Sequence, residues 1–215
     1  MNYDSLIYKP LNGVSFLVFG IFLAVFVLIG ILMRKKSESF KGAVLAWMMI
    51  ATVVGFFAYK YALSVDADYA VILDQADKGG FSWWSELPLQ LCNINLLLIP
   101  VAMATMNRSI LNFNFFTGTL GALMAILMPS IGFSDCSILL PRMLGYYFTH
   151  FMVFTGSLAI MAYGIHTPKF RELPETAVLL LCVAFISLTF MLFLLFQITS
   201  LQRPPCAKGA VTAAP

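Results

Sequence analysis

The sequence predicts an all-α protein, a polytopic bundle of six transmembrane helices with little surface in water. Hydrophobic residues make up 60% of its 215 residues and charged residues only 11%, and the mean hydropathy is +0.89. A soluble domain carries about 25% charged residues, so the charges here are too few to cover a globule. The apolar residues also fall into blocks close to the roughly 20 residues that cross a bilayer.

Each apolar block is expected to form one helix. We place the helices at residues 14–33, 43–63, 87–106, 110–128, 142–165 and 174–198. The first block is expected to be a retained helix, because its basic cluster at 34–36 follows the apolar residues, whereas a signal peptide has its positive charges first. Residues 1–201 are therefore predicted to form one transmembrane domain. The polar tail 202–215, rich in proline and alanine, is expected to be disordered.

Basic residues gather in the loops after the first, third and fifth helices. They are Arg34, Lys35, Lys36, Lys41, Arg108, Lys169 and Arg171. Cytoplasmic loops of membrane proteins are enriched in lysine and arginine. We therefore expect these loops to be cytoplasmic, the N-terminus to lie outside, and the chain to be a multi-pass protein of the cell membrane.

Polar side chains inside a bilayer are costly, so their positions are the main functional signal. In the helix 142–165, at 100° per residue, Arg142, Tyr146, Thr149 and His150 fall within one arc of about 100°. The helix therefore has one polar face, and its other side suits lipid or packing.

The helix 87–106 carries polar residues around much of its circumference. Gln90, Cys92, Asn93 and Asn95 spread over about 220°, which no lipid-facing helix tolerates, so this helix is expected to be central. At 1.5 Å per residue, Cys92 and His150 lie at similar depths, roughly 8 to 12 Å inside the outer boundary. A contact between these two side chains is therefore possible.

Each candidate residue also has a structural interpretation. A lone cysteine such as Cys92 packs like a small hydrophobic residue, and His150 can be a hydrogen-bond partner between helices. Arg142 can anchor to headgroups by snorkelling, and Tyr146 can be purely structural. His166, in a polar loop, is expected to be solvated.

Several function classes are excluded by what the sequence lacks. The net charge of +3 is scattered without a basic stripe, so nucleic acid is not expected as a partner. The four cysteines and two histidines have no metal-ligand spacing, and we expect no metal and no cofactor. No helix interior carries Asp or Glu, which argues against ion-coupled transport. In the helix 110–128, the small residues Gly118, Gly121, Ala122 and Ala125 are expected to allow close helix packing.

Three segments between Trp83 and Ala162 resemble a known family. Residues 87–92, Leu-Pro-Leu-Gln-Leu-Cys, resemble the LPLHLC signature of the bacterial YwaF-type integral membrane proteins. Residues 116–129 look like the glycine-containing helix of that family, which ends in a proline, and residues 142–150 look like its helix beginning with arginine and ending with histidine.

The YwaF-type family is in turn similar to a eukaryotic transmembrane family with acyltransferase activity on ether phospholipids, which uses a membrane cysteine and a histidine. The resemblance places that cysteine at Cys92 and that histidine at His150. It implies a lipid acyltransferase or acyl hydrolase whose partners are membrane lipids. Gln90, Asn93 or Asn95 are then expected to donate to the oxyanion, and Arg142 and Tyr146 to bind substrate.

The chain departs from the family pattern in two places. The histidine that usually precedes Leu-Cys is Gln90, and the chain leaves the pattern near Thr199, where the family continues to a seventh helix. These departures keep two alternatives open. One is a non-enzymatic membrane protein, such as a lipid or small-molecule binder, a carrier or a complex subunit, and the other is an inactive truncated copy.

Overall fold

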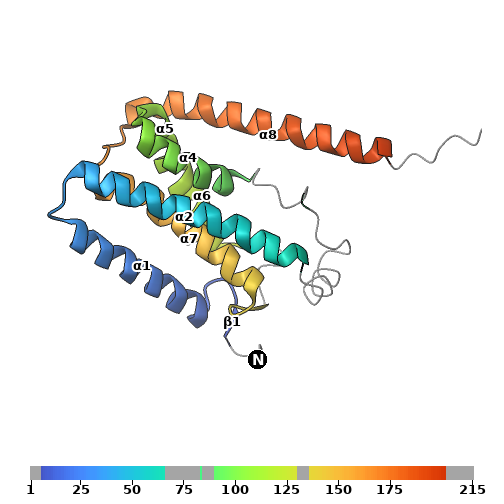
Figure 1. The fold of residues 1–215 in the computed structure, drawn as a ribbon, viewed down its shortest axis with the longest axis horizontal. Helices are drawn as coiled ribbons and strands as arrows, with labels where there is room; N and C mark the ends of the chain where they lie inside the picture. The colour runs from blue at the N-terminus through green and yellow to red at the C-terminus, as the bar shows by residue number, and fades with distance from the viewer. Residues whose placement is uncertain (1–5, 66–82, 84–89, 130–135, 202–215) are drawn as a thin grey trace, which may run out of the picture.

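The computed structural model describes residues 6–65, 83, 90–129 and 136–201, and there the chain forms six helical segments (Figure 1). Five are single helices: α1 (Gly13–Met33), α2 (Glu38–Val65), α4 (Leu91–Thr105), α7 (Pro141–Ala162) and α8 (Leu173–Leu201). The sixth joins α5 (Arg108–Phe113), the π-helical turn η1 (Asn114–Gly118) and α6 (Thr119–Leu127). The short elements are strands β1 (Ile7–Tyr8) and β2 (Cys136–Ser137) and the 3-10 turn η2 (Phe170–Glu172). The predicted all-α bundle is confirmed, and the predicted tail 202–215 lies outside the described residues.

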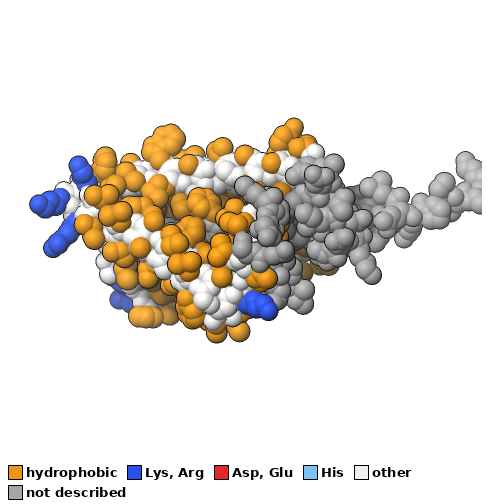
Figure 2. Space-filling model, turned by 90° about the horizontal axis from the view of Figure 1, so that it is seen from below, with side chains coloured by type: hydrophobic (Ala, Val, Ile, Leu, Met, Phe, Trp, Pro, Cys, Tyr) orange, Lys and Arg blue, Asp and Glu red, His pale blue; other side chains and the backbone are white. Residues whose placement is uncertain are grey.

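Most of the helices are long and apolar enough to cross a membrane. In the described part of the chain these are α1, α2, the α5–α6 segment and residues Phe170–Phe193, while α4 is a shorter apolar helix. Figure 2 shows hydrophobic side chains covering one face of the molecule, with most of the visible basic side chains at one end. An apolar surface this extensive would associate in water, and a bilayer is the solvent that suits it.

The helices are antiparallel neighbours, so their connections alternate between two ends of the bundle (Figure 1). We call one the basic end: there α1 turns into α2, α4 into α5, and α7 into η2, and these turns hold the basic residues 34–36, Arg108 and Lys169. The other is the ribbon end, where β1 pairs with β2 in an antiparallel ribbon.

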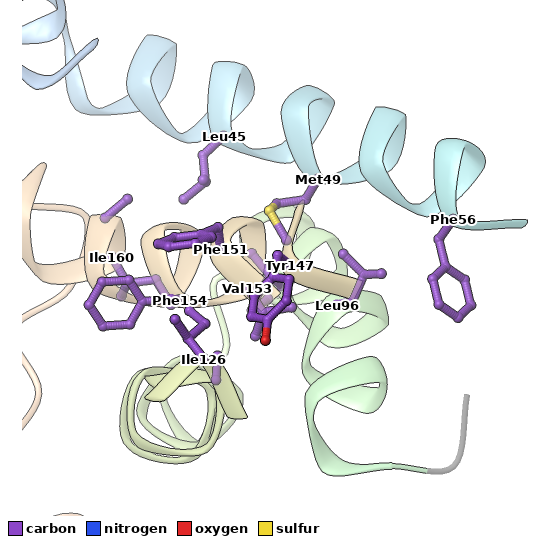
Figure 3. Close-up of a cluster of buried hydrophobic side chains, with 14 of the residues drawn as sticks. Leu45, Met49, Phe56, Leu96, Ile126, Tyr147, Phe151, Val153, Phe154 and Ile160 are labelled. Carbon is purple, nitrogen blue, oxygen red and sulfur yellow. The ribbon is translucent and has the colours of Figure 1, made fainter. Parts of the chain in front are cut away.

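α7 forms the centre of the bundle. It contacts α1, α2, α4, η1 and α6, and its buried Tyr147, Phe151 and Phe154 form much of the core (Figure 3). Met49 of α2 packs closely against α7, because a Cβ added at Gly156 would lie 2.8 Å from its sulfur. Phe151, on the side of the helix that was expected to suit lipid or packing, is buried, and its ring stacks on Phe22 of α1 at 4.2 Å. The polar face of α7 is therefore turned inward, toward α4 and α6.

α8 lies at the side of the bundle and contacts α5 and η2 (Figure 1). Large apolar side chains are exposed along it, including Leu181, Phe185 and Ile186. In a bilayer these side chains face lipid, so α8 needs only a local attachment to the remaining helices.

The ribbon carries one side chain deep into the bundle. Ile7 pairs with Ser137 and Tyr8 with Cys136, and the Tyr8 side chain is almost fully buried. Its hydroxyl donates to the backbone oxygen of Ile126 at 2.9 Å, and its ring lies 4.1 Å from that of Tyr147. The segment preceding α1 is thereby fixed against α6 and α7.

Candidate functional site

The first turn of α4 presents the predicted nucleophile. Gln90 is the N-cap in an extended conformation, with φ −71° and ψ 144°, and its backbone oxygen accepts from Ile94 N at 3.0 Å. The Gln90 side chain makes no capping bond and is exposed. Cys92 follows in the first turn and is half-buried, so its thiol lies at the ribbon end of the bundle.

The Cys92 thiol faces a glycine on the neighbouring helix. A Cβ added at Gly121 of α6 would lie 3.8 Å from Cys92 Sγ and 3.8 Å from Leu91 Cδ2. That is ordinary van der Waals separation, so the hydrogen atom of Gly121 leaves a small gap beside the sulfur. Gly121, one of the small residues predicted to allow close helix packing, therefore lies where α6 approaches Cys92.

Tyr146 of α7 connects the Cys92 region with His150. Its hydroxyl donates to the backbone oxygen of Ala125, one turn from Gly121, at 3.1 Å. Its ring lies 4.1 Å from the His150 ring, and its hydroxyl interacts electrostatically with the Cys92 thiol and with the Tyr8 hydroxyl. The structure thus brings three of the predicted residues, Cys92, Tyr146 and His150, into one neighbourhood.

The hydrogen bonds of His150 define its tautomer. The side chain is 5% exposed, and Nδ1 lies 2.7 Å from the backbone oxygen of Tyr146 in its own helix. A carbonyl oxygen can only accept, so Nδ1 carries the hydrogen and donates it. In the neutral ring Nε2 is then unprotonated and can accept a proton.

The side chains that were predicted to donate to the oxyanion or to bind substrate differ in burial and in their hydrogen bonds. Asn95 is fully buried, with Nδ2 donating to Leu91 O at 2.8 Å and Oδ1 lying 3.0 Å from the Thr117 hydroxyl. Asn93 is buried as well and makes no hydrogen bond to another described residue. Arg142 lies in the first turn of α7, and its side chain is outside the described part. Asn95 therefore holds α4 against η1.

A second polar layer lies at the π-helical turn η1. A Cβ added at Gly118 would lie 2.1 Å from Ser157 Oγ of α7 and 3.3 Å from Asn95 Oδ1. Ser157 Oγ and both amide atoms of Asn114 are buried without a hydrogen-bond partner in the described part of the chain. π-helical turns inside α-helices are often found at functional sites, and this one lets three helices approach closely.

The family of the chain follows from a comparison with protein-family models. The model described as TMEM164 family matches residues 7–211, nearly the whole chain. The chain belongs to the TMEM164 family. This is a transmembrane family, in agreement with the apolar helices. No curated protein and no solved structure matches the chain.

This TMEM164-family chain has a third polar cluster at its basic end. Gly164 has a positive φ of 74° and ends α7, and the backbone N–H of His166 donates to Ile160 O at 3.0 Å. His166 Nε2 lies 2.9 Å from Asn112 Oδ1, and Asn112 Nδ2 donates to Glu172 Oε2. His166 was expected to be merely solvated, and this expectation is wrong: the side chain connects the loop after α7 to α5.

Burial and the neighbouring charges together shift the pKa of His166. Burial lowers the pKa of His166 below its ordinary value, the Glu172 carboxylate counteracts this, and Arg108 and Lys169 add to the lowering. His166 Nε2 faces the amide oxygen of Asn112, so Nε2 carries a hydrogen and donates it, and the neutral ring already satisfies the contact.

A further bond at the basic end joins α8 to α5: the Ser109 hydroxyl donates to Glu175 Oε2 at 3.1 Å.

Two parts of the TMEM164-family site were not predicted from the sequence. Tyr8 precedes the first apolar block, and nothing in its local sequence signals burial. Asn112 and Glu172 are 60 positions apart, so only the fold brings them together.

Among the described residues, no group of three or more His, Cys, Asp or Glu side chains could hold a metal ion.

Proposed function

We propose that the chain transfers acyl groups on membrane lipids, with Cys92 as nucleophile and His150 as general base. The basis is the resemblance of three of its segments to YwaF-type proteins and, through them, to the ether-phospholipid acyltransferase family. The polar neighbourhood of Cys92, Tyr146 and His150 supports this proposal.

The hydrogen bond of His150 Nδ1 to the Tyr146 carbonyl is the observation on which the mechanism rests. A thiol is a nucleophile only after it loses its proton, and among apolar helices it does not do so unaided. A neutral imidazole whose hydrogen is on Nδ1 has a free lone pair on Nε2, and this lone pair can accept the thiol proton. His150 has this arrangement.

The proposed reaction has two steps. His150 Nε2 takes the Cys92 proton, directly or through one water, and the sulfur attacks the carbonyl carbon of a lipid ester. The oxyanion collapses, the ester C–O bond breaks, and the imidazolium returns the proton to the departing lysolipid oxygen, which leaves an acyl thioester on Cys92. A lysolipid hydroxyl, or water in the hydrolase variant, then attacks the thioester with His150 again taking its proton. The C–S bond breaks, and the imidazolium returns the proton to the Cys92 sulfur.

Neighbouring side chains have separate roles in this proposal. Asn93, a buried amide that follows Cys92 in the first turn of α4, is the preferred donor to the oxyanion, and Gln90 at the N-cap is the alternative. Arg142, in the first turn of α7, would bind the lipid phosphate at headgroup level. Tyr146 would hold the His150 ring in position.

The orientation of the bundle is part of the proposal. The basic end is proposed to face the cytoplasm, which places Cys92 in the outer half of the membrane. Cysteines introduced at Lys36 and Asp74 of a cysteine-free variant should then react with an impermeant maleimide from opposite sides of sealed membranes. Labelling of both from one side would refute this topology.

A hydroxylamine-sensitive acyl adduct is the direct test of the nucleophile. The wild-type protein is incubated with phospholipid vesicles that carry a labelled acyl chain. Cys92→Ala and His150→Ala should each abolish the labelled thioester, and the double variant should lose no more than either single one, because the two groups act as a unit.

The matched control is Cys182→Ala, which removes an exposed thiol on α8 and should leave the adduct unchanged. Thermal unfolding of each variant separates lost chemistry from lost fold. A well-folded wild-type protein that never acquires an acyl group on Cys92 would refute the enzyme proposal in favour of a non-enzymatic lipid-binding protein.

A further inference from the structure

A second feature of the bundle lies at the ribbon end, between α1 and α6. It is a cavity of about 220 Å³. Its walls include Leu11, Phe16 and Phe19 on the α1 side and Leu123 and Leu127 on the α6 side, and Tyr8 lies against it. Pockets that enclose a whole small-molecule ligand measure roughly 300–1,000 Å³, so this cavity suits a segment of a chain.

The walls of the cavity are apolar and held in place. The Tyr8 hydroxyl donates to Ile126 O, and the hydroxyl of Ser15, which also lines the cavity, donates to Asn12 O at 2.7 Å. Phe19 is fixed by Phe151 of α7, with ring centroids 5.6 Å apart. A water molecule needs two or more polar partners, and here both hydroxyl hydrogens are already donated.

The cavity is continuous with the lipid-facing surface of the protein. Leu11, just before α1, and Phe16, in the first turn of this apolar helix, line it and are also 63% and 60% exposed. The surrounding solvent at this position is the bilayer, whose acyl chains can enter the cavity sideways without crossing a polar barrier.

We propose that this cavity binds one acyl chain of a membrane phospholipid. The cavity and the Cys92 thiol lie on different sides of α6, because Leu123 lies about 200° around this helix from Gly121, which faces the thiol. Tyr8, which lines the cavity, also interacts with Tyr146, so the two sites are neighbours that share α6. The bound chain is therefore a retained lipid and is not the ester that reacts at Cys92. The proposal stands whether or not the chain transfers acyl groups.

Native mass spectrometry of the purified protein tests the site by counting retained phospholipid. Leu123→Trp fills the cavity and should remove one bound phospholipid per chain. The matched control is Leu120→Trp on the same helix, where the side chain is 62% exposed and does not line the cavity, and it should retain the lipid. Cys92→Ala should also retain it, which separates this site from an acyl adduct on the thiol.

A measurement on the wild-type protein removes any dependence on how well the variants fold. Phosphatidylcholine with a photoactivatable group in one acyl chain is added in vesicles, and the crosslinked peptides are identified by mass spectrometry. Adducts should concentrate on the peptides of residues 11–19 and 123–127. Equal adduct density on all lipid-facing helices, or equal lipid retention by the two tryptophan variants, would overturn the proposal.

Discussion

Replacing Gly118 by alanine would drive a methyl group into the hydroxyl of Ser157. The added Cβ would lie 2.1 Å from Ser157 Oγ and 3.1 Å from Ser157 Cβ, where ordinary contacts exceed 3.4 Å. Overpacking of this kind costs about 1–3 kcal/mol. The helix propensity of alanine over glycine recovers up to about 1 kcal/mol, so we expect Gly118→Ala to lower the free energy of unfolding by about 1–2 kcal/mol.

The same contact predicts the opposite result for its partner. Ser157 Oγ is buried without a hydrogen-bond partner among the described residues, and burial of an unsatisfied hydroxyl costs about 1–3 kcal/mol. Ser157→Ala removes that hydroxyl and is expected to be neutral or stabilising. In the Gly118→Ala background it also removes the 2.1 Å contact, so the double variant should recover about 1 kcal/mol or more relative to the sum of the single changes.

Unfolding by sodium dodecyl sulfate in mixed micelles, followed by tryptophan fluorescence, measures these differences. Gly121→Ala is the matched control in the same helical segment, since its Cβ would meet its neighbours at 3.8 Å and should be tolerated. The reasoning about close approach at η1 is refuted if Gly118→Ala is as stable as Gly121→Ala, or if Ser157→Ala gives no recovery.

Three further predictions concern the polar groups of the bundle. Gly121→Ala should slow alkylation of Cys92 by a small maleimide while leaving the unfolding free energy nearly unchanged, because the methyl fills the gap beside the sulfur; an unchanged rate would contradict that packing. Tyr146→Phe should lower the unfolding free energy by about 0.5–1.5 kcal/mol through loss of the bond to Ala125 O, and a stability equal to wild type would mean that this bond contributes nothing. The lowered pKa of His166 means that the unfolded chain binds more protons below about pH 6.5, so this contribution to stability is present above that pH and lost as the pH falls. Unfolding measured at pH 7 and pH 5 should show a smaller loss for His166→Gln than for wild type, and equal losses would exclude His166 as the cause.

The fold was largely predictable because its determinants are local. An apolar block of about 20 residues favours a membrane-crossing helix whatever its neighbours do, so the sequence predicted an all-α bundle of six helical segments. The π-helical turn Asn114–Gly118 was not predicted, since the apolar pattern continues through it. Its cause is tertiary: Gly118 meets Ser157 of another helix, and no local signal reports that contact.

The candidate site was predictable only as a set of residues at one depth. Helical periodicity placed Tyr146 and His150 on one face and Cys92 at a matching depth, because both follow from rise and angle per residue. Periodicity carries no information about which face of α4 meets α6, so the contact of Cys92 with Gly121 came from the structure. The His166–Asn112 contact joins residues 54 positions apart and was unpredictable for the same reason.

The polar residues of the bundle form three layers that share the α5–α6 segment, and the middle layer affects the one above it. Asn95 lies three residues after Cys92 in α4, and its amide is bonded both to its own helix and to Thr117 of η1. The close approach at Gly118 and Ser157 fixes η1 against α7, so α4, η1 and α7 are located relative to one another at this layer. The position of the Cys92 thiol relative to Tyr146 therefore depends on residues one to two turns away. Under the proposed function, loss of acyl transfer in a variant of Asn95 or Ser157 would indicate a displaced thiol, whereas loss in His150→Ala would indicate a missing base.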